Sequence, residues 1–300
     1  MTDHTFLSSI TKPGRYLGHE YNSTQKDWDA ARTRFALIFP DLYEIGMSHQ
    51  GLQILYHLIN TSDSMLAERC FCADKDAEKL LLEAGTPLTT LESGHRLAEF
   101  DILGFTLPYE LCYTNILTIL NLAGIPFLAQ DRDERFPLLL GGGAGAFNPE
   151  PVADFFDAIL LGDGEEAILQ IGTVLANCKD KGLSKSEVLD TLAEIEGIYI
   201  PAHFNPEYDQ QGHIKAIHRS GGKKDVIKRS ILPDLNDIEH LKHPIVPNAK
   251  IVHDRLGIEV ARGCTRGCRF CQAGITYRPV RERSPEKIMA LADSATADSG

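Results

Sequence analysis

The sequence predicts an α/β protein built on a doubly wound parallel sheet, followed by a connector and the beginning of a second α/β unit. Short apolar runs alternate with segments whose apolar residues recur at helical spacing. The connections between them are short, and the chain of 300 residues, 43% of them hydrophobic, is long enough for about two packed domains. We therefore expect parallel strands with helices on both faces.

The first domain is expected at residues 33–178, with residues 1–32 forming an N-terminal arm that wraps it. The expected strands are residues 34–39, 66–72, 101–107, 138–140 and 158–161, and the expected helices are residues 47–60, 75–84 and 110–122. Asp74 is typical of a helix N-cap, and Gly124 ends the third helix. Asp163 and Glu166 predict a capping box for a further helix that reaches about residue 177.

A connector is expected at residues 179–255. Ser184 and Glu187 predict the start of a helix, and residues 197–201 and 214–218 are expected to pair as strands. Residues 220–250 are rich in Gly, Lys, Pro and Asp and indicate a linker. In the last segment, residues 256–300, a strand at 256–261 precedes a cysteine-rich loop, and a helix begins at Pro285.

The cysteine-rich loop is the strongest functional signal. Residues 263–274 are Gly-Cys-Thr-Arg-Gly-Cys-Arg-Phe-Cys-Gln-Ala-Gly, which spaces Cys264, Cys268 and Cys271 as C-x3-C-x2-C. Thiolates at this spacing, among glycines that permit tight backbone turns, can face one centre. Three cysteine ligands indicate an iron–sulfur cluster with one iron left open to a substrate or cofactor. A zinc site with His253 as fourth ligand is the main rival, whereas a disulfide leaves one cysteine over.

With Phe270 before its last cysteine, this loop resembles the cluster loop of the radical S-adenosylmethionine (SAM) superfamily. The resemblance implies a [4Fe-4S] cluster held by the three cysteines, SAM bound to the open iron, and Phe270 near the adenine. It also implies reductive cleavage of SAM to a 5'-deoxyadenosyl radical that abstracts hydrogen from a substrate. A one-electron donor such as ferredoxin or flavodoxin would be a partner.

Loops that follow the strands supply a second, weaker signal. Ligands of doubly wound sheets bind beyond the carboxyl ends of the strands, where this chain has Asp41-Leu-Tyr-Glu-Ile-Gly46 and Gly141-Gly-Gly-Ala-Gly145. These loops resemble those of the cobalamin-binding domain. Matching or substituting positions are Asp41, Tyr43, Gly46, Thr106, Gly142 and Gly143.

Tyr43 stands where that family has its cobalt-coordinating histidine, and Pro108 replaces a leucine of its Ser-x-Leu element. The resemblance therefore implies cobalamin as a further cofactor without a protein histidine on cobalt, and methyl transfer as an additional reaction. Ordinary turns of a doubly wound fold are the alternative explanation of the glycines. His49, just past the first loop, is expected either near a cofactor or at a helix start.

Residues 39–49, 109–115, 147–151 and 262–285 together resemble a bacterial family of radical SAM proteins with a cobalamin-binding-like N-terminal domain. The resemblance implies that residues 256–300 begin the radical SAM β/α barrel. A full barrel needs roughly 250 residues, so we expect its remaining units on a longer or separate chain.

Two other functions remain open. One is methylthiolation of tRNA or a ribosomal protein, which uses a related loop plus three further cysteine ligands; the scattered Cys70, Cys72, Cys112 and Cys178 fit that pattern poorly. The other is a cofactor-binding chain without catalysis of its own.

Composition narrows the functional classes. A net charge of −12 argues against a general nucleic-acid or anionic-membrane surface. A polar start, no long apolar run and an odd count of seven cysteines predict a cytoplasmic protein that binds metal. Arginines cluster around the cysteine loop, and they would either steady a cluster, the SAM carboxylate or an anionic substrate, or form a solvated surface; they are Arg262, Arg266, Arg269, Arg278, Arg281 and Arg283. The substrate and any catalytic acid or base are not identifiable.

Overall fold

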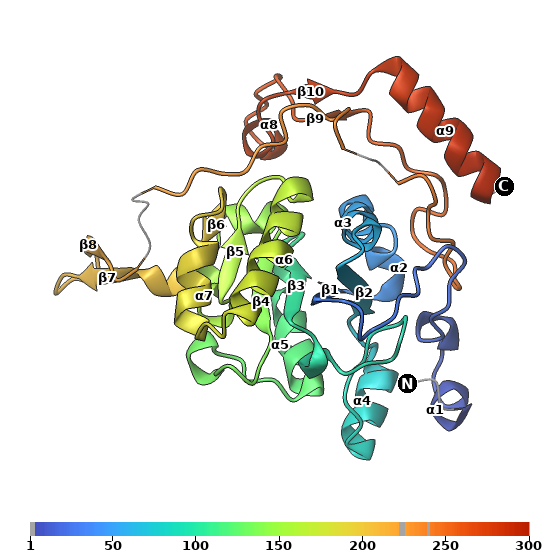
Figure 1. Cartoon of the computed structure of the whole chain (residues 1–300), viewed down its shortest axis with the longest axis horizontal. Helices are drawn as coiled ribbons and strands as arrows, with labels where there is room; N and C mark the ends of the chain where they lie inside the picture. Colours follow the sequence, from blue (N-terminus) through green and yellow to red (C-terminus); the bar gives the residue numbers. More distant parts are fainter. Residues whose placement is uncertain (1–3, 222–225, 239–240, 300) are drawn as a thin grey trace.

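A six-stranded sheet in the order β2-β1-β3-β4-β5-β6 lies at the centre of the computed structural model, which describes residues 4–221, 226–238 and 241–299 (Figure 1). Its strands are β1 (Thr33–Phe39), β2 (Met65–Phe71), β3 (Ile102–Thr106), β4 (Leu138–Gly142), β5 (Ala158–Leu160) and β6 (Ile198–Tyr199). The first five strands are parallel and β6 is antiparallel to β5. The predicted α/β fold class is confirmed, and the strand order reverses between β1 and β3.

Helices cover both faces of this sheet. One core joins the sheet to α3 (Gln50–Thr61), α6 (Glu165–Asp180) and α7 (Lys185–Leu192), and a second core joins it to α4 (Lys75–Ala84) and α5 (Tyr113–Ala123). Along β1, Phe35 and Leu37 belong to the first core while Ala36 and Ile38 belong to the second. Because both faces are buried, most strands are continuous apolar runs rather than alternating ones; β2 also buries Glu68 and Arg69.

Local capping signals set several helix ends as predicted. The side chain of Asp74 caps α4, and Ser184 with Glu187 forms the capping box of α7. The helix predicted at residues 47–60 is α3, which begins three residues later than predicted, and a short helix that was not predicted, α2 (Tyr43–Gly46), precedes it. His49 separates them, and its Nδ1 accepts a hydrogen bond of 3.1 Å from the Leu52 amide at the start of α3.

The capping box predicted at the start of α6 is wrong. The N-cap is Gly164, which makes no side-chain cap bond. The carboxylate of Asp163 instead accepts hydrogen bonds from Arg262 and Arg281, which lie about a hundred residues further along the chain. Two charged donors outcompete a single helical amide for this carboxylate.

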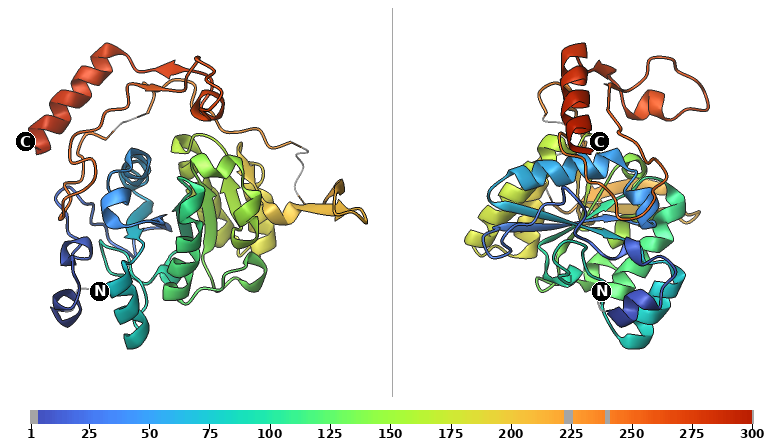
Figure 2. Two further views of the ribbon diagram at one scale, coloured as in Figure 1. Left: turned by 180° about the vertical axis from the view of Figure 1, so that it is seen from behind. Right: turned by 90° about the vertical axis from the view of Figure 1, so that its right-hand side faces the viewer.

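The strand pairing predicted within the connector is also wrong. Residues 198–199 form β6 and extend the central sheet, while β8 (Ile214–Arg219) pairs with β7 (Phe204–Tyr208) in a hairpin that projects from the body (Figure 2). The predicted linker has no helix or strand in its described part, yet Leu232, Leu235 and Ile245 are buried. Its residues 222–225 and 239–240 lie outside the described residues.

The C-terminal segment arches over the carboxyl edge of the sheet (Figures 1 and 2). The strand predicted at residues 256–261 is reduced to β9 (Ala261–Arg262), which pairs antiparallel with β10 (Arg281–Glu282). Between them lies the cysteine loop, residues 263–280, with the short helix α8 (Ala273–Thr276). The last helix, α9 (Pro285–Ser299), begins at Pro285 as predicted.

The remaining elements are short. The N-terminal arm holds α1 (His4–Ser8), and 3₁₀ turns occur at Pro13–Arg15, Leu97–Glu99, Glu110–Cys112, Ala129–Asp131, Ala144–Phe147, Glu150–Phe155 and Pro201–His203. Tyr16 and Glu20 of the arm are buried against the domain. Within the described residues, no helix combines the length and the apolar character that crossing a membrane requires.

Candidate functional site

A cavity of about 430 Å³ lies where the strand order reverses. Its walls come from the ends of β1, β3, β4 and β5, from the starts of α3 and α6, and from residues 259–263 and Tyr277 of the C-terminal segment. Sheets of this order bind ligands at the reversal point, and the volume falls within the range of small-molecule sites. The cavity therefore lies between the sheet and the cysteine loop.

The carboxyl ends of β3 and β4 give the cavity an open floor. Thr106, Gly142 and Gly143, three of the predicted cofactor-binding residues, lie here together. A Cβ at Gly142 would have no neighbour closer than 3.9 Å, the carbonyl oxygen of Leu160. Together with apolar walls that include Leu37 and Phe105, this open floor lets a bulky ligand approach the backbone of β4 closely.

His49 also lines the cavity, so it both caps a helix and faces the candidate ligand space. Burial lowers the pKa of His49, which favours the neutral ring. Because Nδ1 accepts the Leu52 amide hydrogen, the neutral ring carries its proton on Nε2. In this state the ring offers a hydrogen-bond donor and has no free lone pair for cobalt.

Three other predicted cofactor positions lie outside the cavity lining. Tyr43 is 1% exposed, donates a hydrogen bond of 3.1 Å to Glu20 and accepts one of 3.0 Å from the Asn248 amide. At Gly46 a Cβ would lie 2.3 Å from the Phe71 ring, so this glycine permits close packing of α2. Their contact with a cofactor stays a prediction.

Asp41, the third of these positions, accepts hydrogen bonds from the Tyr109 hydroxyl and from the Leu42 amide, the latter 2.7 Å long. The bond from Tyr109 to this carboxylate, together with burial, raises the pKa of Tyr109 to about 12. The pair closes the loop after β1 against the loop after β3, which keeps the two strand ends at the reversal point together.

The cysteine loop carries free thiols, with Cys264 and Cys271 partly exposed and Cys268 exposed. Positive φ angles at Gly263 and Gly267 provide the tight backbone that the sequence predicts. Among the described residues, no group of three or more Cys, His, Asp or Glu side chains is arranged to hold a metal ion. Three free cysteine thiols are the donors that an iron–sulfur cluster needs. Their sulfurs do not converge on one point in this structure.

The rival zinc site with His253 is likewise not assembled in the part of the chain that the structure describes. His253 is exposed, and its amide donates to Ser48 at 3.1 Å. Phe270, predicted to lie near the adenine of SAM, is 91% exposed.

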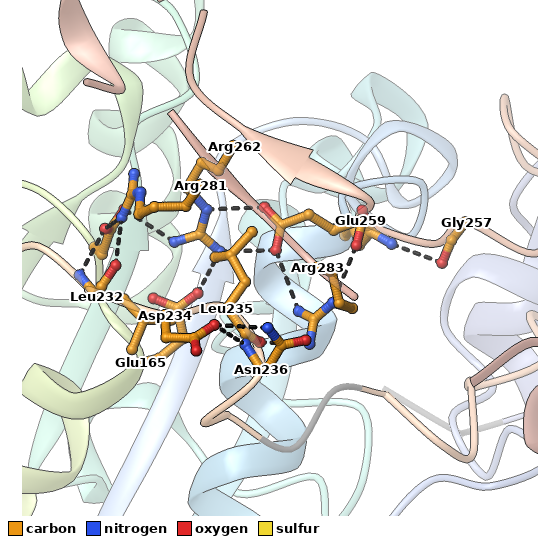
Figure 3. A network of polar contacts seen from close by, with 12 residues as sticks. Glu165, Leu232, Asp234, Leu235, Asn236, Gly257, Glu259, Arg262, Arg281 and Arg283 are labelled. Atoms are coloured by element: carbon orange, nitrogen blue, oxygen red, sulfur yellow. Dashed lines mark hydrogen bonds and ion pairs between the residues drawn. The ribbon is translucent and has the colours of Figure 1, made fainter. Parts of the chain in front are cut away.

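An ion-pair network lies between the cavity and the cysteine loop (Figure 3). Arg262 donates to Glu259 at 2.8 Å, to Asp163 at 2.9 Å and to Glu165 at 2.5 Å. Arg283 donates to the carbonyl oxygens of Glu259 and Leu235. The bonds to Asp163, Glu165 and Leu235 join the C-terminal segment to the sheet edge or to the connector, whereas those to Glu259 stay within that segment.

The network also includes Arg281, which donates to Asp163 and, at 2.8 Å, to the carbonyl oxygen of Leu232. Burial acts to raise the pKa of Asp163, but the hydrogen bond from Arg281, the Leu232 amide and the charge of Arg262 outweigh it and hold that pKa below its usual value. Asp163 is therefore an anion at neutral pH.

This network divides the predicted arginine cluster into two sets. The side chains of Arg262, Arg281 and Arg283 are at most 15% exposed and bind carboxylates and carbonyl oxygens of the protein. The other three, Arg266, Arg269 and Arg278, are exposed. The interpretation as a solvated surface is therefore wrong for the first set, and only the second set is open to an anionic ligand.

Sequence reasoning missed Asp163, Glu259 and Tyr277, which line the cavity. The sequence did carry a signal for the first two. Six arginines lie between residues 262 and 283 with only one acidic residue, Glu282, among them, so carboxylates outside this stretch were to be expected as their partners. Tyr277 gave no such signal.

Comparisons with known proteins match most of the sheet domain to one family. The family model described as "Radical SAM proteins, N-terminal" matches residues 51–201, half of the chain. An uncharacterized protein of Methanocaldococcus jannaschii is 24% identical over 261 residues, which are 86% of this chain and 45% of that protein. This chain thus spans less than half of the length of that relative.

Two solved structures of OxsB, a cobalamin-dependent S-adenosylmethionine radical enzyme, are similar to this chain at 16% identity and a TM-score of 0.48. The structure with aqua-cobalamin and S-adenosylmethionine bound matches 89% of this chain and 32% of that one; the structure with aqua-cobalamin matches 87% and 31%.

Proposed function

The chain belongs to the family of radical SAM proteins that share this N-terminal domain, and from this membership we propose a radical SAM enzyme whose cluster is held by Cys264, Cys268 and Cys271. The observation that carries the proposal is the position of a loop with three free thiols beside a ligand-sized cavity at the carboxyl edge of the sheet. When bound, the cluster and SAM would supply a one-electron cleavage that produces a 5'-deoxyadenosyl radical. The substrate is a molecule with an abstractable hydrogen and is otherwise unidentified.

The chain's own residues would bind and orient these groups. Three thiolates would hold the cluster, and the exposed Phe270 would pack on the adenine of SAM. Arg266, Arg269 and Arg278 remain available for the SAM carboxylate or an anionic substrate, because the other three arginines are committed to the network.

We further propose that the cavity holds part of a cobalamin. Its open floor at Gly142 and its apolar walls support this ligand. The neutral ring of His49 would act toward it as a hydrogen-bond donor and not as a cobalt ligand. Methyl transfer would then be an additional reaction. Further units of the β/α barrel would complete the site from a longer or a separate chain, and a ferredoxin or flavodoxin would supply the electron.

Anaerobic reconstitution tests the cluster. We expect about four iron and four sulfide ions per chain and the electron paramagnetic resonance (EPR) signal of a reduced cubane, both lost in Cys268→Ala. Zinc on the same cysteines, with no oxygen-sensitive brown chromophore, would refute the proposal. Cleavage of SAM should be measured on a chain that includes the rest of the barrel.

The methylthiolation alternative needs a second cluster in the N-terminal domain. Cys70, Cys72, Cys112 and Cys178 are all buried, and the described residues contain no metal-holding group of three. Iron counts of about eight per chain would nevertheless revive it.

A further inference from the structure

The two ends of the cysteine loop are fastened to the sheet by one carboxylate. Asp163 Oδ1 accepts a hydrogen bond of 2.9 Å from Arg262 Nη1, and Oδ2 accepts one from Arg281 Nη1. Arg262 directly precedes the loop and Arg281 directly follows it. The loop of residues 263–280 therefore begins and ends at the same acceptor.

Asp163 itself is held in place by the backbone. Its amide donates to the carbonyl oxygen of Ser230 at 2.9 Å, the Ser230 amide donates to Leu161 at 2.8 Å, and the Leu232 amide donates to Asp163 Oδ2 at 2.9 Å. Its side chain is 9% exposed and lines the cavity. Because Asp163 is held by these bonds, it can fix the positions of the two arginines that donate to it.

The network that surrounds this anchor carries no large net charge. Three carboxylates, those of Asp163, Glu165 and Glu259, face the guanidinium groups of Arg262, Arg281 and Arg283 (Figure 3). Such an arrangement is poorly suited to attract an anion, because its charges compensate one another. It is well suited to fix geometry, because charge-assisted bonds to buried carboxylates are short and directional.

We propose that Asp163 is a positioning residue that holds both ends of the cysteine loop over the cavity. It would thereby fix the position of a cluster on the loop relative to a ligand in the cavity. The part of this inference that concerns the cluster rests on the proposed function of the three cysteines. The part that concerns the loop ends rests on the hydrogen bonds alone.

The substitution Asp163→Asn keeps the size of the side chain and removes its negative charge and one of its two acceptor oxygens. An amide has one acceptor oxygen and one NH₂ donor, so one of the two arginines would face another donor. The comparison variant Glu259→Gln removes a carboxylate that pairs with Arg262 and, at 3.7 Å, with Arg283, but it leaves the bonds of Asp163 to Arg262 and Arg281 intact.

Hydrogen exchange on the full chain reports the loop ends directly. The amide of Arg283 donates to Val260 across the β9–β10 ribbon at 2.9 Å, and its exchange should be about tenfold faster or more in Asp163→Asn. The same amide should stay within about twofold of wild type in Glu259→Gln. Peptides from β1 and β3 should keep wild-type protection in both variants. Unchanged exchange at Arg283 in Asp163→Asn would overturn the proposal.

Cluster retention tests the second part. After anaerobic reconstitution, the iron of Asp163→Asn should pass to a chelator about tenfold faster than that of wild type, with a broadened EPR signal. Wild-type retention and an unchanged signal would limit Asp163 to a structural role and overturn the proposed positioning. If wild type itself takes up no cluster, the proposed function fails, whereas the exchange result still decides whether Asp163 holds the loop ends. Should Asp163→Asn not fold, Arg281→Met removes the bond between Arg281 and Asp163 and is measured in the same two ways.

Discussion

Filling the cavity at Gly142 should weaken ligand binding without weakening the fold. A Cβ at this position would have its nearest neighbours at 3.9 and 4.0 Å, which is ordinary contact distance, and the φ angle is not in the left-handed region. In Gly142→Leu the new side chain would therefore point into open, apolar space rather than into packed atoms. Replacing this glycine also reduces the conformational entropy of the unfolded chain.

The expected change in the free energy of unfolding follows from two contributions. Reduced unfolded-state entropy contributes about 0.4–1 kcal/mol, and partial burial of a leucine contributes up to about 2 kcal/mol. Gly142→Leu should thus unfold at an equal or higher urea concentration than wild type. Its affinity for aquacobalamin, followed by the corrinoid absorbance, should fall by a factor of about ten or more, which corresponds to about 1.4 kcal/mol of binding free energy.

The matched control is Gly162→Ala, at the other side of the cavity. Gly162 has φ +110°, and a Cβ there would lie 2.0 Å from the carbonyl oxygen of Ser230. This variant should lose stability by about 1 kcal/mol or more. Equal affinity of Gly142→Leu and wild type for aquacobalamin would show that the corrinoid does not occupy this cavity, and no binding by wild type would remove cobalamin from the proposal.

Three further predictions concern the rest of the molecule. Arg69→Met should lower the free energy of unfolding at pH 7 by about 3–5 kcal/mol in urea titrations, because it strips two buried glutamates of their partner; since burial raises the pKa of one of them, Glu92, the loss should shrink toward pH 5. Alkylation of the native apo protein should label the three loop cysteines and spare the four buried ones, and mass spectrometry that finds buried thiols modified equally fast would contradict this. His49 should be neutral with its proton on Nε2 in ¹⁵N NMR spectra at pH 6.5. Because its folded pKa is depressed, stability should fall as pH drops below about 6.5, the unfolded value, and His49→Asn, which keeps a capping acceptor, should reduce that dependence; His203, whose pKa burial also lowers, keeps its own share.

The parts of the fold that local chemistry determines were predictable from the sequence. Apolar runs predicted four of the five parallel strands because each is buried on both faces, and β2 was predicted despite Glu68 and Arg69 in its middle. Asp74 and the Ser184–Glu187 pair cap their helices because their bonds reach only one to three residues along the chain. The spacing of the cysteines is equally local.

The parts that depend on distant residues were not predictable. Asp163 has the sequence pattern of a helix cap, but its bond to Arg281 joins residues 118 positions apart. A capping bond is worth about 1 kcal/mol, and two charge-assisted bonds exceed it. Residues 198–199 pair with β5 rather than with β8, because the edge of the central sheet offers a buried partner. The cavity draws on segments from Leu37 to Tyr277, of which only His49, Thr106 and the glycine floor were visible in the sequence.

The cysteine loop has fixed ends and an exposed middle, an arrangement that would favour binding of the proposed cluster. The buried ion pairs of Arg262 and Arg281 already hold the loop closed, so binding a cluster does not require the loss of chain entropy that loop closure demands. What remains to be ordered lies between them, where Cys268 and Phe270 are exposed. Metal binding supplies free energy for such ordering. It follows that cluster uptake should protect the amides of residues 264–274 from hydrogen exchange while leaving those of Arg262 and Arg281 nearly unchanged, and a rearrangement at the loop ends would show that the anchor forms only after the cluster.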